Sequence, residues 1–201
     1  MLEARELQCE RGGRELFREL SFSVKSGELV RIAGPNGSGK SSLLRILCGL
    51  LAPIAGEVRW QGAPIHSLRE EYSRQLVYLG HAAGAKDDLT AAENLDIACR
   101  LAGQSAAVDS IERALSRFDV PRGPTLRRLS QGQRRRAVLA RLALGEALPL
   151  WLLDEPFSAL DAGGIELLNE QLQQHLARGG AVAFTTHQDP GVAAARVIEL
   201  G

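Results

Sequence analysis

The sequence has little lysine and no excess of charge of either sign. Only three of its 201 residues are lysines, so nearly all of its positive charge comes from arginine. The 24 basic residues balance the 24 acidic ones, which disfavours sequence-independent binding to nucleic acid and predicts no nucleic-acid partner. A lysine at a special position in such a chain is therefore a candidate functional residue.

Cysteines and long hydrophobic runs are also scarce. Cys9, Cys48 and Cys99 lie far apart and form no C-x-x-C pair, which argues against a zinc site or a disulfide framework and is typical of a reducing cytosol. The strongest apolar run, ALPLWLL, is too short to span a bilayer. The charged first residues predict no secretion signal. We expect a soluble protein, so that any membrane role needs partners with spanning helices.

The hydrophobic pattern changes along the chain. Short apolar segments between turn residues predict a mainly β front end over roughly residues 1–60. Helical spacing follows from about 90 to 118 and from about 131 to 145. The last third alternates buried strands with helices, which is typical of a parallel sheet covered on both faces. The sequence therefore predicts an α/β fold with an N-terminal antiparallel β subdomain and an all-helical insertion at approximately 82–145, within one domain over 1–201.

The segment GPNGSGKS fits the phosphate-loop pattern G-x-x-x-x-G-K-[ST]. It follows an apolar strand and precedes a helical pattern, as this motif requires. The glycines let backbone N–H groups converge on phosphate, and the helix N-terminus adds its positive dipole. Lys40 is placed to reach the β- and γ-phosphates and the Ser41 hydroxyl to ligate Mg²⁺. The residues expected to bind the nucleotide are Gly34, Pro35, Asn36, Gly37, Ser38, Gly39, Lys40, Ser41 and Ser42.

Polar residues follow two buried strands of the last third. Asp154 and Glu155 come directly after LWLL, at the edge where open α/β sheets bind ligands. A carboxylate leaving an apolar strand needs a positive partner, so we assign Asp154 to Mg²⁺ and Glu155 to the attacking water as general base. His187 follows the strand AVAFTT at the same edge, and we expect it to contact the γ-phosphate. The predicted catalytic residues are thus Lys40, Glu155 and His187.

The ordered series GPNGSGKS, LSQGQ, LWLLDE, SALD and TTHQ resembles that of the ATP-binding cassette (ABC) ATPases. The resemblance covers nearly the whole chain, and LSQGQ is its most specific part. It implies a P-loop NTPase core of the RecA-like type, and hydrolysis of ATP with Mg²⁺ as cofactor.

The resemblance also implies a homodimer of ATPase subunits in the ATP-bound state. Each ATP would lie between the phosphate loop of one subunit and the LSQGQ segment of the other, with Ser130 and Gly132 at the nucleotide and Asp161 across the interface. A physical argument agrees with this. LSQGQ opens a predicted helix and so forms a second anion site, and one γ-phosphate meets both sites only if a second chain brings one of them.

Two positions depart from the family pattern. His81 stands where a Gln usually contacts Mg²⁺ and the water. Imidazole is a poorer ligand for a hard cation than an amide oxygen, so we expect His81 to act through a water or through a contact that couples the site to the membrane partner. Arg11 stands where an aromatic residue commonly stacks on adenine, and a guanidinium can also stack on a base.

Within the family, the segments LEARELQCERGGRELF, YLGH, LSQGQRRR and LDEPFSALD are similar to ATPase subunits of bacterial cytochrome c maturation (haem export) complexes. That similarity implies a peripheral protein on the cytoplasmic face of the inner membrane, bound to integral transporter subunits of the complex, and a role in haem export or haem-chaperone release. Two alternatives stay open: the ATPase of another ABC transporter, and a soluble ABC ATPase acting on nucleic acid.

Three consecutive arginines follow LSQGQ on the same predicted helix. Arg134, Arg135 and Arg136 then point in three directions, so they cannot line one nucleic-acid patch. We expect most of this charge to be solvated or paired with acidic neighbours.

Overall fold

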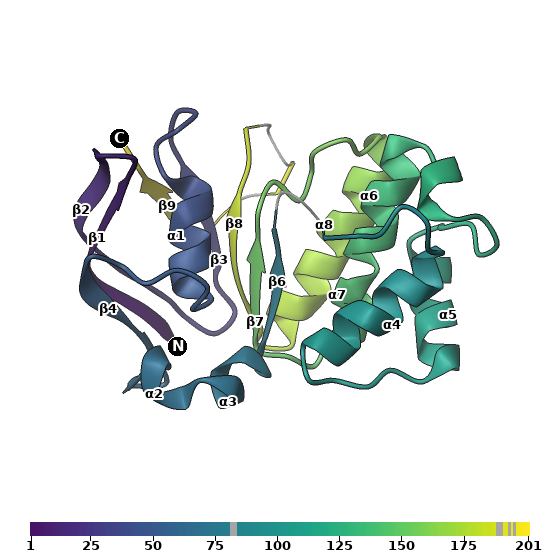
Figure 1. Ribbon diagram of the computed structural model, residues 1–201, viewed down its shortest axis with the longest axis horizontal. Coiled ribbons are helices and arrows are strands. Elements are labelled where there is room, and N and C mark those ends of the chain that lie inside the picture. Colours follow the sequence, from purple (N-terminus) through teal and green to yellow (C-terminus); the bar gives the residue numbers. More distant parts are fainter. Residues whose placement is uncertain (81–83, 188–190, 193, 195) are drawn as a thin grey trace.

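The computed structural model describes residues 1–80, 84–187, 191–192, 194 and 196–201. Two sheets organise this part of the chain, and the first is antiparallel (Figure 1). Its alternating buried and exposed residues fit a sheet with one face toward the core. Across the sheet its strands are β2 (Arg14–Val24), β1 (Leu2–Arg11), β4 (Ala55–Trp60) and β5 (Ala63–Pro64).

The second sheet is parallel and lies in the middle of the molecule. Two of its strands, β7 (Leu150–Leu153) and β8 (Ala181–Thr185), are buried at every residue, as expected for strands with both faces covered. All the described strands of this second sheet run parallel to one another, so their carboxyl ends meet at one edge of the sheet. Across this sheet the strands are β6 (Leu76–Leu79), β7 (Leu150–Leu153), β8 (Ala181–Thr185), β3 (Leu29–Ala33) and β9 (Arg196–Glu199).

Helix α1 (Lys40–Leu47) lies between the two sheets (Figure 1). Leu43, Leu44 and Leu47 are fully buried there, in a core shared with β1, β3 and β7. Burying a leucine side chain stabilises a fold by about 1.5–3 kcal/mol, so this packing fixes where α1 begins. The first turn of α1 therefore lies at the carboxyl end of β3, where the phosphate loop joins them.

The opposite face of the parallel sheet is covered by a second core, around Phe118, Trp151 and Phe157. Helix α4 begins with a capping box, in which the Thr90 hydroxyl accepts from the Glu93 N–H and the Glu93 carboxylate accepts from the Thr90 N–H. The helices beyond α1 are α2 (Ile65–Leu68), α3 (Glu70–Ser73), α4 (Ala91–Leu101), α5 (Val108–Arg117), the 3₁₀ turn η1 (Leu126–Arg128), α6 (Gln131–Leu139), α7 (Arg141–Leu144) and α8 (Ala162–Ala177).

These elements confirm the predicted α/β fold with its antiparallel sheet near the N-terminus. The helical pattern predicted over about 131–145 is divided at Ala140 into α6 and α7. Helices α4 to α7 lie between Ala91 and Leu144. The limits of the insertion, approximately 82–145, and the single domain over 1–201 stay predictions.

A buried histidine joins α8 to the parallel sheet. The His175 ring is 2% exposed and stacks on Trp151, with ring centroids 3.8 Å apart and planes inclined by 7°. Gly180 leaves room for it, since a Cβ at Gly180 would lie 2.2 Å from His175 Nε2. Burial lowers the pKa of His175, and the nearby charge of Arg178 acts in the same direction. The folded protein therefore favours the neutral imidazole.

This burial makes stability depend on pH. The stabilisation from neutral His175 is complete above the unfolded pKa of about 6.5, and it is lost as the pH falls below that value, because the unfolded chain then binds a proton that the folded chain resists. We expect His175→Phe to remove part of this dependence, by up to about 1.4 kcal/mol per pH unit. Urea unfolding at about pH 7.5 and about pH 5.5 measures it. The exposed His66→Gln is the control. An equal pH dependence in His175→Phe and the parent would contradict the assignment.

Candidate nucleotide-binding site

The phosphate loop connects β3 to α1 and uses glycines where side chains do not fit. Gly34 has φ +142°, and a Cβ there would lie 2.3 Å from the Leu200 carbonyl oxygen. Gly37 has φ +81° and nothing within 4 Å of its ideal Cβ position, so a ligand can approach its backbone from that side. Gly39, with φ +101°, precedes the first residue of α1. The loop thus directs free N–H groups at the helix N-terminus, which suits an anion.

Lys40 is nearly buried at the start of α1. It is 7% exposed, and its Nζ donates to the carbonyl oxygens of Gly34 (2.8 Å) and Pro35 (2.9 Å). The ammonium is therefore held over the loop by two backbone acceptors, and its third donor is available to a phosphate oxygen.

Asp154 and Glu155 leave the carboxyl end of β7 toward this loop. Asp154 is 1% exposed, and its Oδ1 accepts from Thr185 Oγ1 at 2.8 Å. Its Oδ2 is buried and has no hydrogen-bond partner among the described residues. A buried carboxylate oxygen without a donor is costly unless a cation or a donor meets it. This carboxylate oxygen and the Ser41 hydroxyl are both oxygen donors of the type that Mg²⁺ prefers.

Glu155 adopts a backbone conformation that is uncommon for its residue type. Its φ is +51°, in the left-handed region. Its N–H donates to Thr185 Oγ1 at 2.9 Å. Its Oε2 accepts from the His187 N–H at 3.2 Å, and His187 Nε2 lies 3.1 Å from Oε1. The two predicted catalytic residues of this edge are therefore in contact with each other.

A hollow of about 640 Å³ lies between these groups and the antiparallel sheet. Lys40, Glu155 and His187 all line it, which brings together residues that were predicted from separate motifs. Gly34, Pro35, Ser38 and the buried Asp154 do not line it. The lining consists of Arg11, Arg14, Leu16, Asn36, Gly37, Gly39, Lys40, Ser41, Ser42, Glu155, Ser158 and His187.

Of the residues of LSQGQ and SALD, only Ser158 lines this hollow. Ser130 caps α6, its hydroxyl accepting from the Gln133 N–H at 3.2 Å. Asp161 caps α8 by accepting from the Gly164 N–H at 2.9 Å. Neither these two residues nor Gly132 lines the hollow within one chain. His81 lies outside the described residues.

Three further residues contact the site at the carboxyl edge of the parallel sheet and were not predicted from the sequence. Thr185 bridges Asp154 and Glu155 with one hydroxyl. Ser158 lines the hollow, and Arg135 donates to the backbone beside Glu155. The sequence carries a signal for two of them. Thr185 is the polar end of a strand predicted to reach the same edge, and Ser158 lies three residues after Glu155, in the SALD segment. Arg135 reaches the site through tertiary packing alone.

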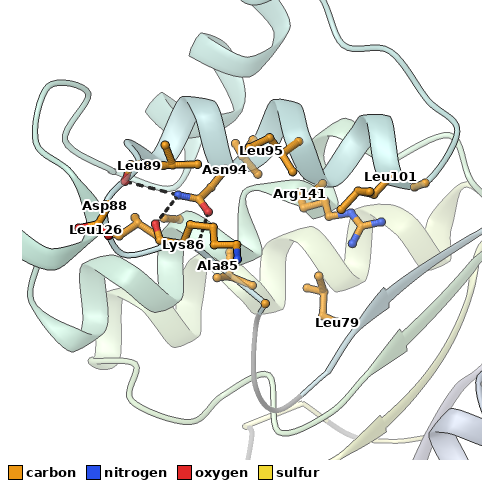
Figure 2. Close-up of a pocket in the computed structure, with 16 residues that line it drawn as sticks. Leu79, Ala85, Lys86, Asp88, Leu89, Asn94, Leu95, Leu101, Leu126 and Arg141 are labelled. Atoms are coloured by element: carbon orange, nitrogen blue, oxygen red, sulfur yellow. Dashed lines mark hydrogen bonds between the residues drawn. The ribbon is translucent and has the colours of Figure 1, made fainter.

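A separate groove lies on the helical side of the parallel sheet (Figure 2). It measures about 650 Å³, and its walls are mainly apolar side chains of α4 and α6. Asn94 orders its edge by bonding the backbone of Lys86 and Leu89. Arg141 lies in its wall, where burial lowers the pKa of the guanidinium. Leu101 is 84% exposed at the groove. This much exposed apolar surface is typical of an interaction site.

The phosphate loop, the buried carboxylates and the parallel sheet define a P-loop nucleotide-binding protein. The profile of the ABC transporter family matches residues 17–158. The chain therefore belongs to the ABC transporter family and is one of its ATPases. Among the described residues, no helix is both long enough and apolar enough to cross a membrane.

The chain is similar to several proteins called cytochrome c biogenesis ATP-binding export protein CcmA. It is 53% identical over 195 residues to the one from Aromatoleum aromaticum, covering 94% of this chain and 89% of that protein. It is 47% identical over 199 residues to the one from Escherichia coli K12, covering 98% and 94%.

A solved structure with a similar fold is a dimeric ATP-binding cassette in a post-hydrolysis state bound to ADP and Pi. Its TM-score is 0.85 at 26% identity, and the match covers 100% of this chain and 94% of that chain.

Proposed function

We propose that residues 1–201 form a single ABC ATPase domain that supplies energy to a membrane complex for c-type cytochrome biogenesis, in haem export or haem-chaperone release. The observation that carries the ATPase part is the hollow lined together by Lys40, Glu155 and His187. The biogenesis part is supported by the similarity to proteins named for that process. In this proposal the protein binds the cytoplasmic face of the bacterial inner membrane through integral transporter subunits.

We assign residues of the site the following roles in hydrolysis. ATP places its phosphates on the loop residues from Gly34 to Ser42, and Lys40 neutralises charge on the β- and γ-phosphates. Ser41 and Asp154 would hold Mg²⁺, and the bound ion would neutralise charge on the phosphates. Glu155 orients the attacking water and accepts its proton. His187, in contact with Glu155, reaches toward the γ-phosphate, and Arg11 stacks on the base.

The position of the signature residues favours a homodimer in the ATP-bound state. Ser130, Gly132 and Asp161 do not line the hollow of their own chain. A γ-phosphate held by one phosphate loop meets Ser130 and Gly132 only if a second copy brings them. Asp161 then lies at the same interface, and His81 follows β6 with a coupling role toward the membrane partner.

The groove beside α4 supports the placement of the membrane partner. Its apolar walls and the half-buried Arg141 suit an apolar segment of a transporter subunit that carries one acidic group. We expect Leu101→Glu to reduce membrane association by at least about tenfold, because a charge then replaces an exposed apolar anchor. Membrane fractionation and co-purification of the chain from its native cells measure this.

The matched control for this experiment is Val108→Glu. Val108 is 75% exposed on α5 and does not line the groove. ATP binding by both purified variants should equal that of the parent. Equal membrane association of Leu101→Glu and the parent would exclude the groove as the docking site. A parent chain that stayed wholly soluble and purified with nucleic acid would overturn the transporter role itself.

A further inference from the structure

The three consecutive arginines of α6 reach three different parts of the molecule. Arg134 donates to the Leu126 carbonyl and lies 3.4 Å from Asp87. Arg136 lies 3.4 Å from both Asp119 and Asp161. These two follow the expectation that the charges pair with acidic neighbours. Arg135 differs from them, because its guanidinium donates to three backbone carbonyls.

The Arg135 side chain donates hydrogen bonds to three successive backbone carbonyls directly after β7. Its Nε donates to the Pro156 oxygen at 3.2 Å, and its Nη2 donates to the Asp154 oxygen at 3.3 Å and to the Glu155 oxygen. Only a planar guanidinium, with five donors in a fixed fork, serves three acceptors in this way. The Arg135 side chain thus binds the backbone carbonyl of Glu155 and those of the residues before and after it.

This backbone needs anchoring. A non-glycine residue with φ +51° costs of order 1 kcal/mol or more, and it persists only when its surroundings hold it. Thr185 holds the Glu155 N–H, and Arg135 holds the Glu155 carbonyl. The φ of Glu155 sets the direction of its side chain, so these two anchors also aim the carboxylate.

The surroundings of Arg135 strengthen its hold. The residue is half-buried and lines a second hollow of about 620 Å³, whose wall also includes Glu155 and Ser158. Burial lowers the pKa of the guanidinium, while the charges of Asp154 and Glu155 act in the opposite direction. Hydrogen bonds from a cation in such partly dry surroundings are stronger than those of a neutral donor. Glu155 and Ser158 therefore line both this hollow and the nucleotide hollow.

We propose that Arg135 is a positioning residue for hydrolysis: it clamps the carbonyls of Asp154, Glu155 and Pro156 and thereby aims the Glu155 carboxylate at the nucleotide hollow. The inference rests on the proposed role of Glu155 as general base. Arg135 touches neither substrate nor water in this arrangement, and acts through the backbone that it holds.

Steady-state ATPase kinetics and ATP binding of the purified full chain test the inference. Arg135→Gln keeps a short polar side chain but loses the fork, and we expect kcat to fall about 10- to 100-fold while KM and the Kd for ATP stay within about twofold. Arg135→Lys keeps the charge and one donor, so its kcat should lie between those of the parent and Arg135→Gln. Arg134→Gln is the matched control on the same helix and should keep the parent kcat.

A double-mutant cycle with Glu155→Asp separates positioning from a merely structural role. The shorter carboxylate is already misplaced, so Arg135→Gln should cost much less in that background than in the parent. Equal losses in both backgrounds, or a parent-like kcat in Arg135→Gln, would overturn the inference. If Arg135→Gln does not fold, a parent-like kcat in Arg135→Lys overturns it instead. Parent-like hydrolysis in Glu155→Asp and Glu155→Gln together would reject the general base itself, a result distinct from failure of the clamp.

Discussion

A Glu155→Gln chain binds ATP like the parent but hydrolyses it at least about 100-fold more slowly, because an amide cannot accept the proton of the attacking water. The amide keeps the size of the carboxylate, and its oxygen can still accept from the His187 N–H, so the local geometry survives. With hydrolysis blocked, the ATP-bound homodimer should accumulate. Single-turnover hydrolysis and size-exclusion chromatography with and without ATP measure the two effects.

The control for this substitution is Glu170→Gln, at an exposed position of α8 away from the hollow. It removes the same charge and should change neither hydrolysis nor dimerisation. Normal turnover in Glu155→Gln would exclude Glu155 as the base. A slow variant that stays monomeric with ATP would instead contradict the proposed dimer and leave the base in place.

Residues whose chemistry depends on neighbours in the chain could be predicted from the sequence. The phosphate loop is one contiguous turn between a strand and a helix, and its glycine spacing reports a backbone that must take positive φ at Gly34, Gly37 and Gly39. Asp154 and Glu155 end a strand that is apolar at every position, which already places them at the carboxyl edge of the sheet. Parallel pairing of β7 with β8 then brings His187 to the same edge without further information.

The sequence alone did not predict the contact between Arg135 and Glu155, which are 20 residues apart. Nothing local distinguishes Arg135 from Arg134 and Arg136, because all three have the same chemistry and only tertiary contacts decide their partners. The left-handed φ of Glu155 was equally hidden, since a glutamate carries no local signal for it.

The hydrophobic periodicity of the sequence also did not predict the boundary between α6 and α7. Apolar residues recur from about 131 to 145, which predicted one helix, yet the structure divides it at Ala140 into α6 and α7. Arg141, the first residue of α7, donates to the Tyr78 carbonyl at 3.4 Å and lines the groove beside α4. The amphipathic pattern alone does not reveal this division.

Lys40→Ala should weaken ATP binding about 10- to 100-fold, the loss expected when a nearly buried ammonium no longer meets a phosphate. Lys40 is one of only three lysines in the chain, and its Nζ is held by the carbonyls of Gly34 and Pro35 at the mouth of the loop. Without the ammonium, these two carbonyl oxygens can accept hydrogen bonds from water instead, so the free energy of unfolding should fall by no more than about 1–3 kcal/mol. Isothermal titration with ATP measures the affinity, and urea unfolding checks the fold.

Lys25→Ala provides the matched control, because Lys25 is exposed and donates to the Glu28 carboxylate through its backbone N–H, which alanine retains. It should bind ATP like the parent. Unchanged ATP affinity in Lys40→Ala would contradict the assignment of the phosphate loop. A loss of affinity in Lys40→Ala with parent-like affinity in Glu155→Gln would separate the two functions of the hollow, since the loop then holds the phosphates and the edge of the sheet acts only on the water.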